Sequence, residues 1–189
     1  MPQPFTRGLR LAALLVFMLV PLVNYLAVAN GSSQFDDDVP TRVDAADYAF
    51  SIWGLIFGGM LLFSWALWRQ KDGPASTPQS RGLAWLIVAG LASMVFVPLS
   101  FLGNQFLVWL DLLAHLLPLI LANQALRQHA TALPSATAWR WAYAFPSVYL
   151  GWISAATVIS TALMLVEQGL RLSLQVETTI ALVLVGVLF

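Results

Sequence analysis

The sequence predicts an all-α fold, a polytopic bundle of transmembrane helices, and three observations lead to this prediction. The chain of 189 residues is 59% hydrophobic and only 10% charged, whereas soluble domains carry about 25% charged residues. Its apolar residues form blocks close to the roughly 20 residues that a helix needs to cross a bilayer. The blocks lack the alternation of apolar and polar residues found in barrel strands, so we expect helices.

The first apolar block covers residues 11–30 and follows Arg7 and Arg10. This arrangement fits a retained first helix and also a cleavable signal peptide. Asn24 and Tyr25 lie within an apolar stretch that is longer than the usual signal-peptide core, which favours the retained helix. Asn24 could also hydrogen-bond to a neighbouring helix.

The second block covers residues 48–68 and presents two different faces. Gly54 and Gly58 form a GxxxG pattern, which predicts a close approach of another helix. Large side chains recur at helical spacing on an adjacent face: Phe50, Trp53, Phe57 and Met60, followed by Ser64. This face predicts the wall of a ligand cavity. The alternative is an interfacial aromatic belt, which we favour for Tyr48 at the edge of the block.

The third and fourth blocks cover residues 82–103 and 105–126, and only a short connection at Gly103 and Asn104 separates them. We therefore expect an antiparallel hairpin. In the fourth block Asp111 and His115 are four residues apart, on one face of a helix. Ionisable groups at membrane depth usually face a cavity or a partner. The pair predicts a proton relay, a polar floor for a ligand, or an axial haem ligand; a structural hydrogen-bonded pair is the alternative.

The fifth block covers residues 141–166 and repeats the two-faced design of the second. Small residues at a spacing of four predict a helix-packing face: Ser147, Gly151 and Ala155. A second face carries rings and small polar groups: Tyr149, Trp152, Ala156 and Ser160. Pro146 lies near the start of the expected helix, where it either kinks the helix or frees the carbonyl of residue 142. The final apolar residues, 178–189, are too short for a full span and predict the start of a sixth helix.

The distribution of charge predicts the orientation. Cations gather before the first block and in alternate connections: Arg7, Arg10, Arg69, Lys71, Arg81, Arg127 and Arg140. We expect a bacterial inner membrane, and for a protein in that membrane the positive-inside rule places the N-terminus in the cytoplasm. The connection 31–47 is then an outer loop, and its five aspartates keep it solvated. With a net charge of zero, nucleic acid is not an expected partner.

Three stretches resemble one known family. NYLAVANG (24–31), AFSIWGLIF (49–57) and FPSVYLGWISAAT (145–157) are similar to motifs of the tryptophan-rich sensory protein, or translocator protein (TspO), family, most of all its longer bacterial branch. The resemblance implies a five-helix bundle, a possible homodimer, and a cavity for porphyrins or sterols capped by loop 31–47. Haem or protoporphyrin would be a ligand rather than a fixed cofactor. The resemblance marks these positions: Phe50, Trp53, Pro146, Trp152, Ala156 and Ser160.

The chain departs from the family pattern at several positions. Ala45, Ala46 and Asp47 replace the residues that the family carries ahead of its second helix, and Ser160 replaces an asparagine. MVFV (94–97) stands where the family has an Asn-x-x-Trp motif. The tyrosine of the second-helix motif is retained as Tyr48.

These observations leave three hypotheses for function. The first is a membrane receptor or carrier for a planar hydrophobic ligand, bound in an aromatic-lined cavity. Its candidate contacts are Asn24, Phe50, Trp53, Phe57, Tyr149, Trp152, Ala156 and Ser160. The second is a proton-coupled transporter that uses Asp111 and His115, and the third is a structural membrane protein. The absence of cysteine excludes thiolate catalysis and Cys-ligated metals. No catalytic set or metal cluster is visible, so an enzyme is the least favoured class.

Overall fold

The computed structural model describes residues 7–29, 51–69, 77–131 and 144–169, together with a few positions between 173 and 182. These ranges hold five long helices: α1 (Arg7–Ala29), α2 (Ile52–Arg69), α3 (Thr77–Ser100), α4 (Gln105–Thr131) and α6 (Phe145–Glu167). No strand occurs in them, so the predicted all-α class is confirmed for the part of the chain that is described. Loop 31–47 and nearly all of the expected partial helix at 178–189 lie outside the described residues.

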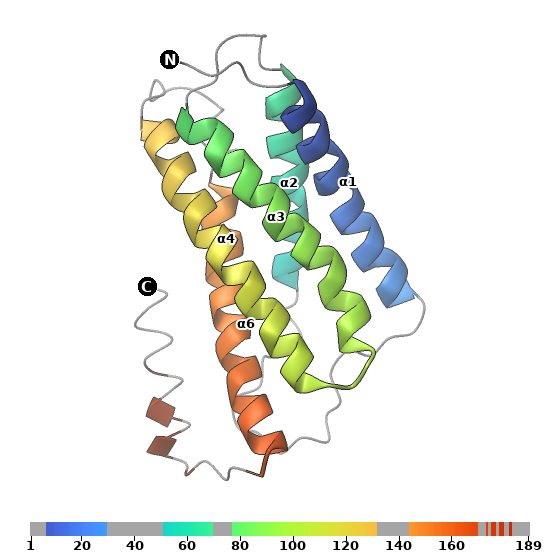
Figure 1. The fold of residues 1–189 in the computed structure, drawn as a ribbon, viewed down its shortest axis with the longest axis vertical. Coiled ribbons are helices and arrows are strands. Elements are labelled where there is room, and N and C mark those ends of the chain that lie inside the picture. Colours follow the sequence, from blue (N-terminus) through green and yellow to red (C-terminus); the bar gives the residue numbers. More distant parts are fainter. Residues whose placement is uncertain are drawn as a thin grey trace.

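The five helices form one bundle (Figure 1), and their contacts close into a ring. α1 contacts α2 and α3, α3 contacts α4, α4 contacts α6, and α6 returns to α2. The order around the bundle is therefore α1, α2, α6, α4, α3. The interface between α3 and α4 is the most extensive, and the interface between α2 and α6 is the smallest.

A four-residue turn joins α3 to α4, as the sequence predicts. α3 ends at Ser100 and α4 begins at Gln105. Gly103 has a φ of +61°, a left-handed conformation that favours glycine. The side-chain oxygen of Asn104 accepts a hydrogen bond from the backbone N–H of Leu107 at 3.2 Å, which caps the start of α4.

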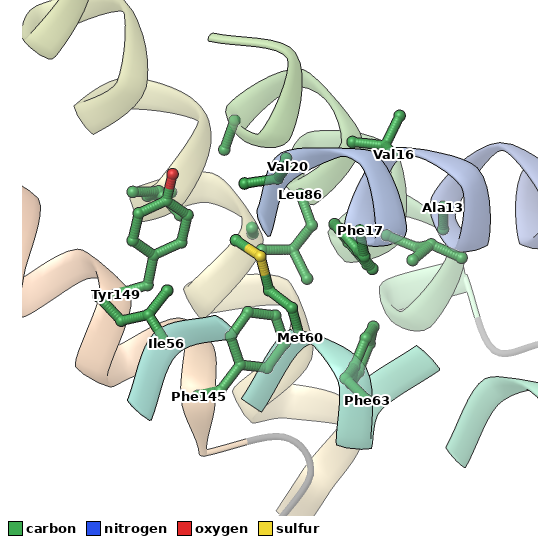
Figure 2. Close-up of a cluster of buried hydrophobic side chains, with 14 of the residues drawn as sticks. Ala13, Val16, Phe17, Val20, Ile56, Met60, Phe63, Leu86, Phe145 and Tyr149 are labelled. Atoms are coloured by element: carbon green, nitrogen blue, oxygen red, sulfur yellow. The ribbon is translucent and has the colours of Figure 1, made fainter. Parts of the chain in front are cut away.

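The surface and the core have the composition of a membrane protein. All five helices are long and apolar enough to span a bilayer. Large apolar side chains point outward along them, such as Leu15, Leu62 and Leu117, each more than 60% exposed. The interior is also apolar: Phe17, Met60, Phe63 and Phe145 meet at its centre (Figure 2). Helices that are apolar on their inner and their outer faces are suited to a lipid environment. The protein is therefore an integral membrane protein.

The helices approach each other closely at glycines outside the GxxxG pattern of α2. A Cβ added at Gly59 would overlap the Cβ of Phe145, and one added at Gly90 would lie 2.5 Å from a methyl group of Val16. Gly54, Gly58 and Gly151, by contrast, have open space where a side chain would lie. The close helix approach predicted at Gly54 and Gly58 therefore does not occur among the described helices of this chain. Ile56, Met60 and Phe63 define the core side of α2 and turn those two glycines outward.

Prolines lie at two kinds of position. Pro21, Pro98 and Pro118 lie inside α1, α3 and α4, respectively. Pro146 lies in the first turn of α6, where its missing N–H removes no helical hydrogen bond. The predicted position near the helix start is confirmed, and residue 142, whose carbonyl Pro146 was expected to free, lies outside the described residues.

Candidate ligand-binding site

Trp53 is the centre of an aromatic cluster between α2 and α6. Its ring centroid lies 5.4 Å from that of Phe57 on the same helix, 6.1 Å from Tyr149 and 6.3 Å from Trp152. The two contacts with α6 are edge-to-face, an arrangement that aromatic quadrupoles favour. Trp53, Phe57 and Trp152 are only partly buried, whereas Tyr149 is fully buried. The ring faces predicted separately on two helices thus meet at one interface.

Tyr149 connects this aromatic cluster to the polar residues of α4. Its ring centroid lies 6.2 Å from the ring of His115, which in turn lies 6.4 Å from Phe96 on α3. Both contacts are edge-to-face. In Figure 2 the Tyr149 ring extends away from Phe145 and Met60, and its hydroxyl points away from the apolar cluster. The sequence suggested an aromatic wall and an ionisable pair as separate features, and the structure places them side by side.

Asp111 and His115 form a buried pair along one face of α4. His115 Nδ1 lies 3.2 Å from the backbone carbonyl oxygen of Asp111 and 3.1 Å from the carboxylate oxygen Oδ2. Both neighbours are acceptors, so Nδ1 carries a hydrogen and donates to the carbonyl oxygen. The carboxylate oxygen is close to the ring but has no hydrogen bond of acceptable geometry, and His115 Nε2 also has none.

Ser93 on α3 completes a set of buried polar groups that we call the buried polar cluster: Ser93, Asp111, His115 and Tyr149. The Ser93 hydroxyl lies near the phenol group of Tyr149. Neither hydroxyl meets the geometry of a hydrogen bond. Ser93 was not among the predicted site residues; its only signal in the sequence is a lone hydroxyl in the apolar stretch LIVAGLASMVFV (86–97).

The other predicted contacts have varied surroundings. Ser160 is buried and its Oγ accepts a hydrogen bond from Gln105 Nε2 at 2.8 Å, which links α6 to α4. Ala156 is partly buried against the core. Asn24 donates to the carbonyl oxygen of Val20 at 2.8 Å, within α1 and not to a neighbouring helix. Phe50 lies outside the described residues. Ligand contact by each of these residues stays a prediction.

The residues around His115 do not fit an axial haem ligand. A haem iron needs an open coordination position above a flat macrocycle. His115 is only 1% exposed, and its ring is contacted by Phe96 and Tyr149. Among the described residues, no three histidine, cysteine or acidic side chains come together as metal ligands would. The cluster therefore suits hydrogen bonding better than metal chemistry.

Five helices that are able to span a membrane surround an interior in which aromatic side chains and buried polar groups lie between α2, α4 and α6. These features define the class of the protein: a polytopic membrane protein with an aromatic and polar interior. The model of the TSPO-like protein family matches residues 10–189. The chain belongs to this family, which the predicted resemblance named. No curated protein and no solved structure matches the chain.

Proposed function

We propose that the protein is a membrane receptor or carrier that binds a planar hydrophobic ligand, of porphyrin, tetrapyrrole or sterol-like shape, against the aromatic cluster. One observation carries the proposal: Trp53 contacts Tyr149 and Trp152 across the smallest helix interface of the ring. Trp53 and Trp152 remain partly exposed there. Membership of the TSPO-like family supports the same ligand class.

The chemistry of the cluster fits such a ligand. Aromatic rings offer a large apolar area and stack on other π-systems, with about 0.5–1.5 kcal/mol per pair beyond the burial of area. Trp53 and Trp152 lie on different helices, so a ligand between them would contact α2 and α6 together. Loop 31–47 is proposed as the lid over this site.

A double substitution tests the aromatic site. The Trp53→Ala, Trp152→Ala variant is expected to bind protoporphyrin IX about 10-fold more weakly, because it removes two ring contacts of roughly 0.5–1.5 kcal/mol each. Binding is followed by the absorbance of the porphyrin with purified protein in detergent. The matched control is Trp65→Ala, Trp68→Ala, which removes two exposed tryptophans from α2. Unchanged affinity in the first variant, or equal loss in both, would refute the assignment.

A proton-coupled transporter is the second candidate, and the buried pair on α4 favours it. Asp111 Oδ2 and His115 Nε2 are both buried without a hydrogen-bond partner, as groups that exchange protons can be. The expected result in proteoliposomes is a pH-gradient-driven flux of the ligand that Asp111→Asn abolishes. Stoichiometric binding without flux would support the receptor instead.

A homodimer is a further proposal. Gly54 and Gly58 lie on the outer side of α2 with open space beside them, and glycines at this spacing let two helices approach closely. Cross-linking in native membranes tests the dimer, and Gly58→Ile is expected to weaken it. A chain that stays monomeric before and after the change would exclude this arrangement.

A further inference from the structure

One end of the bundle gathers positive charge. The beginnings of α1 and α3 and the ends of α2 and α4 lie at this end (Figure 1). We call it the cationic end, after the four arginines that the structure describes there: Arg10, Arg69, Arg81 and Arg127. The ring contact between Phe17 and Phe63 shows that Arg10 and Arg69 lie at similar depth, because each is about 10 Å farther along its helix.

The described part of the chain offers no acidic side chain to neutralise this end. Its two acids are Asp111 and Glu167. Asp111 lies 16 residues before Arg127, about 24 Å along α4, and Glu167 lies at the other end of the bundle, where α6 ends. In the sequence, the connection between α2 and α3 adds Lys71 and Asp72, whose charges cancel. The cationic end therefore carries an excess of positive charge.

Arg69 and Arg81 differ in the direction of their side chains. Long side chains in a helix point toward its N-terminus. α2 ends at the cationic end, so Arg69 reaches back along the membrane-spanning part, and its Cζ lies over the ring of Trp65, 5.2 Å from the ring centroid. α3 begins at this end, so the same rule directs Arg81 away from the span and toward water.

The guanidinium of Arg69 lies on the outer side of α2. Leu62, Trp65 and Trp68 are 62%, 52% and 73% exposed there, and Arg69 is exposed as well. A charge held back beside lipid is unfavourable unless it gains a partner. The ring covers one face of the planar guanidinium, and the N–H donors along its edge match the geometry of a phosphate group. Tryptophan itself favours the headgroup level of a bilayer.

We propose that this outer face of α2 binds an anionic phospholipid. The lipid site consists of Leu62, Trp65, Trp68 and Arg69. Arg69 donates hydrogen bonds to the phosphate, the two tryptophans flank the headgroup, and Leu62 contacts an acyl chain. The excess positive charge of the cationic end favours a headgroup with a net negative charge over a zwitterionic one. Trp53 of the aromatic site is 12 residues before Trp65, about 18 Å along α2, so the two sites are separate.

Native mass spectrometry of the purified full chain tests the lipid site. The protein is equilibrated in mixed micelles with equal amounts of dioleoylphosphatidylglycerol and dioleoylphosphatidylcholine, and the retained lipids are compared. The two lipids share their acyl chains and the phosphate and differ in the net charge of the headgroup. The unaltered protein is expected to retain the phosphatidylglycerol about fivefold more, which is the preference that one arginine beside an anionic headgroup provides.

Three variants assign the preference to the lipid site. Arg69→Gln removes the charge and keeps N–H donors, so it is expected to remove most of the preference. Arg81→Gln is the matched control, because it removes one charge from an exposed residue of the same end that points toward water. It is expected to leave the preference nearly unchanged. Trp65→Leu keeps an apolar side chain but removes the ring that holds Arg69, and a loss of roughly twofold is expected.

Each outcome of these measurements is decisive. Equal retention of the two lipids by the unaltered protein overturns the lipid site, and this comparison needs no variant to fold. Equal losses in Arg69→Gln and Arg81→Gln also overturn it, because the preference would then follow the total charge of the cationic end. A second copy of the chain on this face would give dimers without retained lipid, which has the same consequence. A preference that Arg69→Gln removes and Arg81→Gln keeps supports the lipid site.

Discussion

The contact between Gly59 and Phe145 sets how closely α2 and α6 approach, and it provides a matched pair of substitutions. A Cβ at Gly59 would overlap the Cβ and ring of Phe145, whereas the neighbouring Gly58 has nothing within 4 Å of the same atom. The Cβ of Phe145 is fixed to the α6 backbone, so only a shift of the whole helix could make room. Gly59→Ala and Gly58→Ala therefore add the same methyl group to the same helix in two different environments.

The difference between these two variants can be worked out. Overpacking typically costs 1–3 kcal/mol in a filled interior, roughly the range expected at Gly59. Replacing glycine by alanine in a helix gains about 1 kcal/mol, and this gain applies to both positions and cancels. Gly59→Ala is thus expected to be about 1–3 kcal/mol less stable than Gly58→Ala. In a chain of this size, each kcal/mol shifts the melting temperature by about 2–4 °C.

Thermal unfolding in one detergent, followed by the near-ultraviolet signal of the tryptophans, measures this difference. The reference is the unaltered protein, and Gly58→Ala is expected to melt at the same temperature or slightly higher. If Gly59→Ala melts at or above the temperature of Gly58→Ala, the close approach of α2 and α6 at this point is not real. The arrangement of the aromatic site would then need revision, because the same two helices carry it.

Three further predictions concern the turn, the α4–α6 interface and the orientation. Gly103→Ala is expected to lower the free energy of unfolding by about 1–2 kcal/mol, because a side chain is strained at its positive φ; denaturant titration measures the change. The hydrogen bond from Trp109 Nε1 to Thr161 Oγ1, 2.9 Å long, is expected to contribute about 0.6 kcal/mol in a double-mutant cycle with Trp109→Phe and Thr161→Val; no coupling would show that the bond does not hold the helices. Single cysteines at Ser33 and Ala75 test the topology, since the chain has none of its own. An impermeant maleimide added outside is expected to label the first and not the second, and the reverse pattern would invert the orientation.

The residues that share a face of one helix could be predicted from the sequence, because the α-helical period is fixed by the backbone. Trp53 and Phe57 fall on one side of α2, and Asp111 and His115 on one side of α4, as their spacing requires. The bilayer also limits the choice of secondary structure to helices or a closed barrel, so long apolar blocks were enough to predict five spans.

The arrangement of those faces in space could not be predicted from spacing. Nothing in the spacing along α4 indicates that α6 lies beside it, and this contact is what brings His115 next to Tyr149. The GxxxG pattern in α2 likewise does not specify whether it faces the core or the lipid. Ser93 carried no pattern at all, since a single hydroxyl has no spacing to evaluate.

The distribution of prolines gives the bundle two sides of different stiffness. Pro21 and Pro118 each remove one backbone donor from the middle of a helix, and Pro98 removes one near the end of another. They lie in α1, α4 and α3, which are consecutive in the ring. The helices that carry Trp53 and Trp152, α2 and α6, have no such interruption within their spans. The aromatic contacts therefore lie on two uninterrupted helices, α2 and α6, whereas the proline-containing helices α1, α3 and α4 can bend more easily. A change in the internal width of the bundle would therefore come from bending of α1, α3 and α4, and it would leave the aromatic contacts in place.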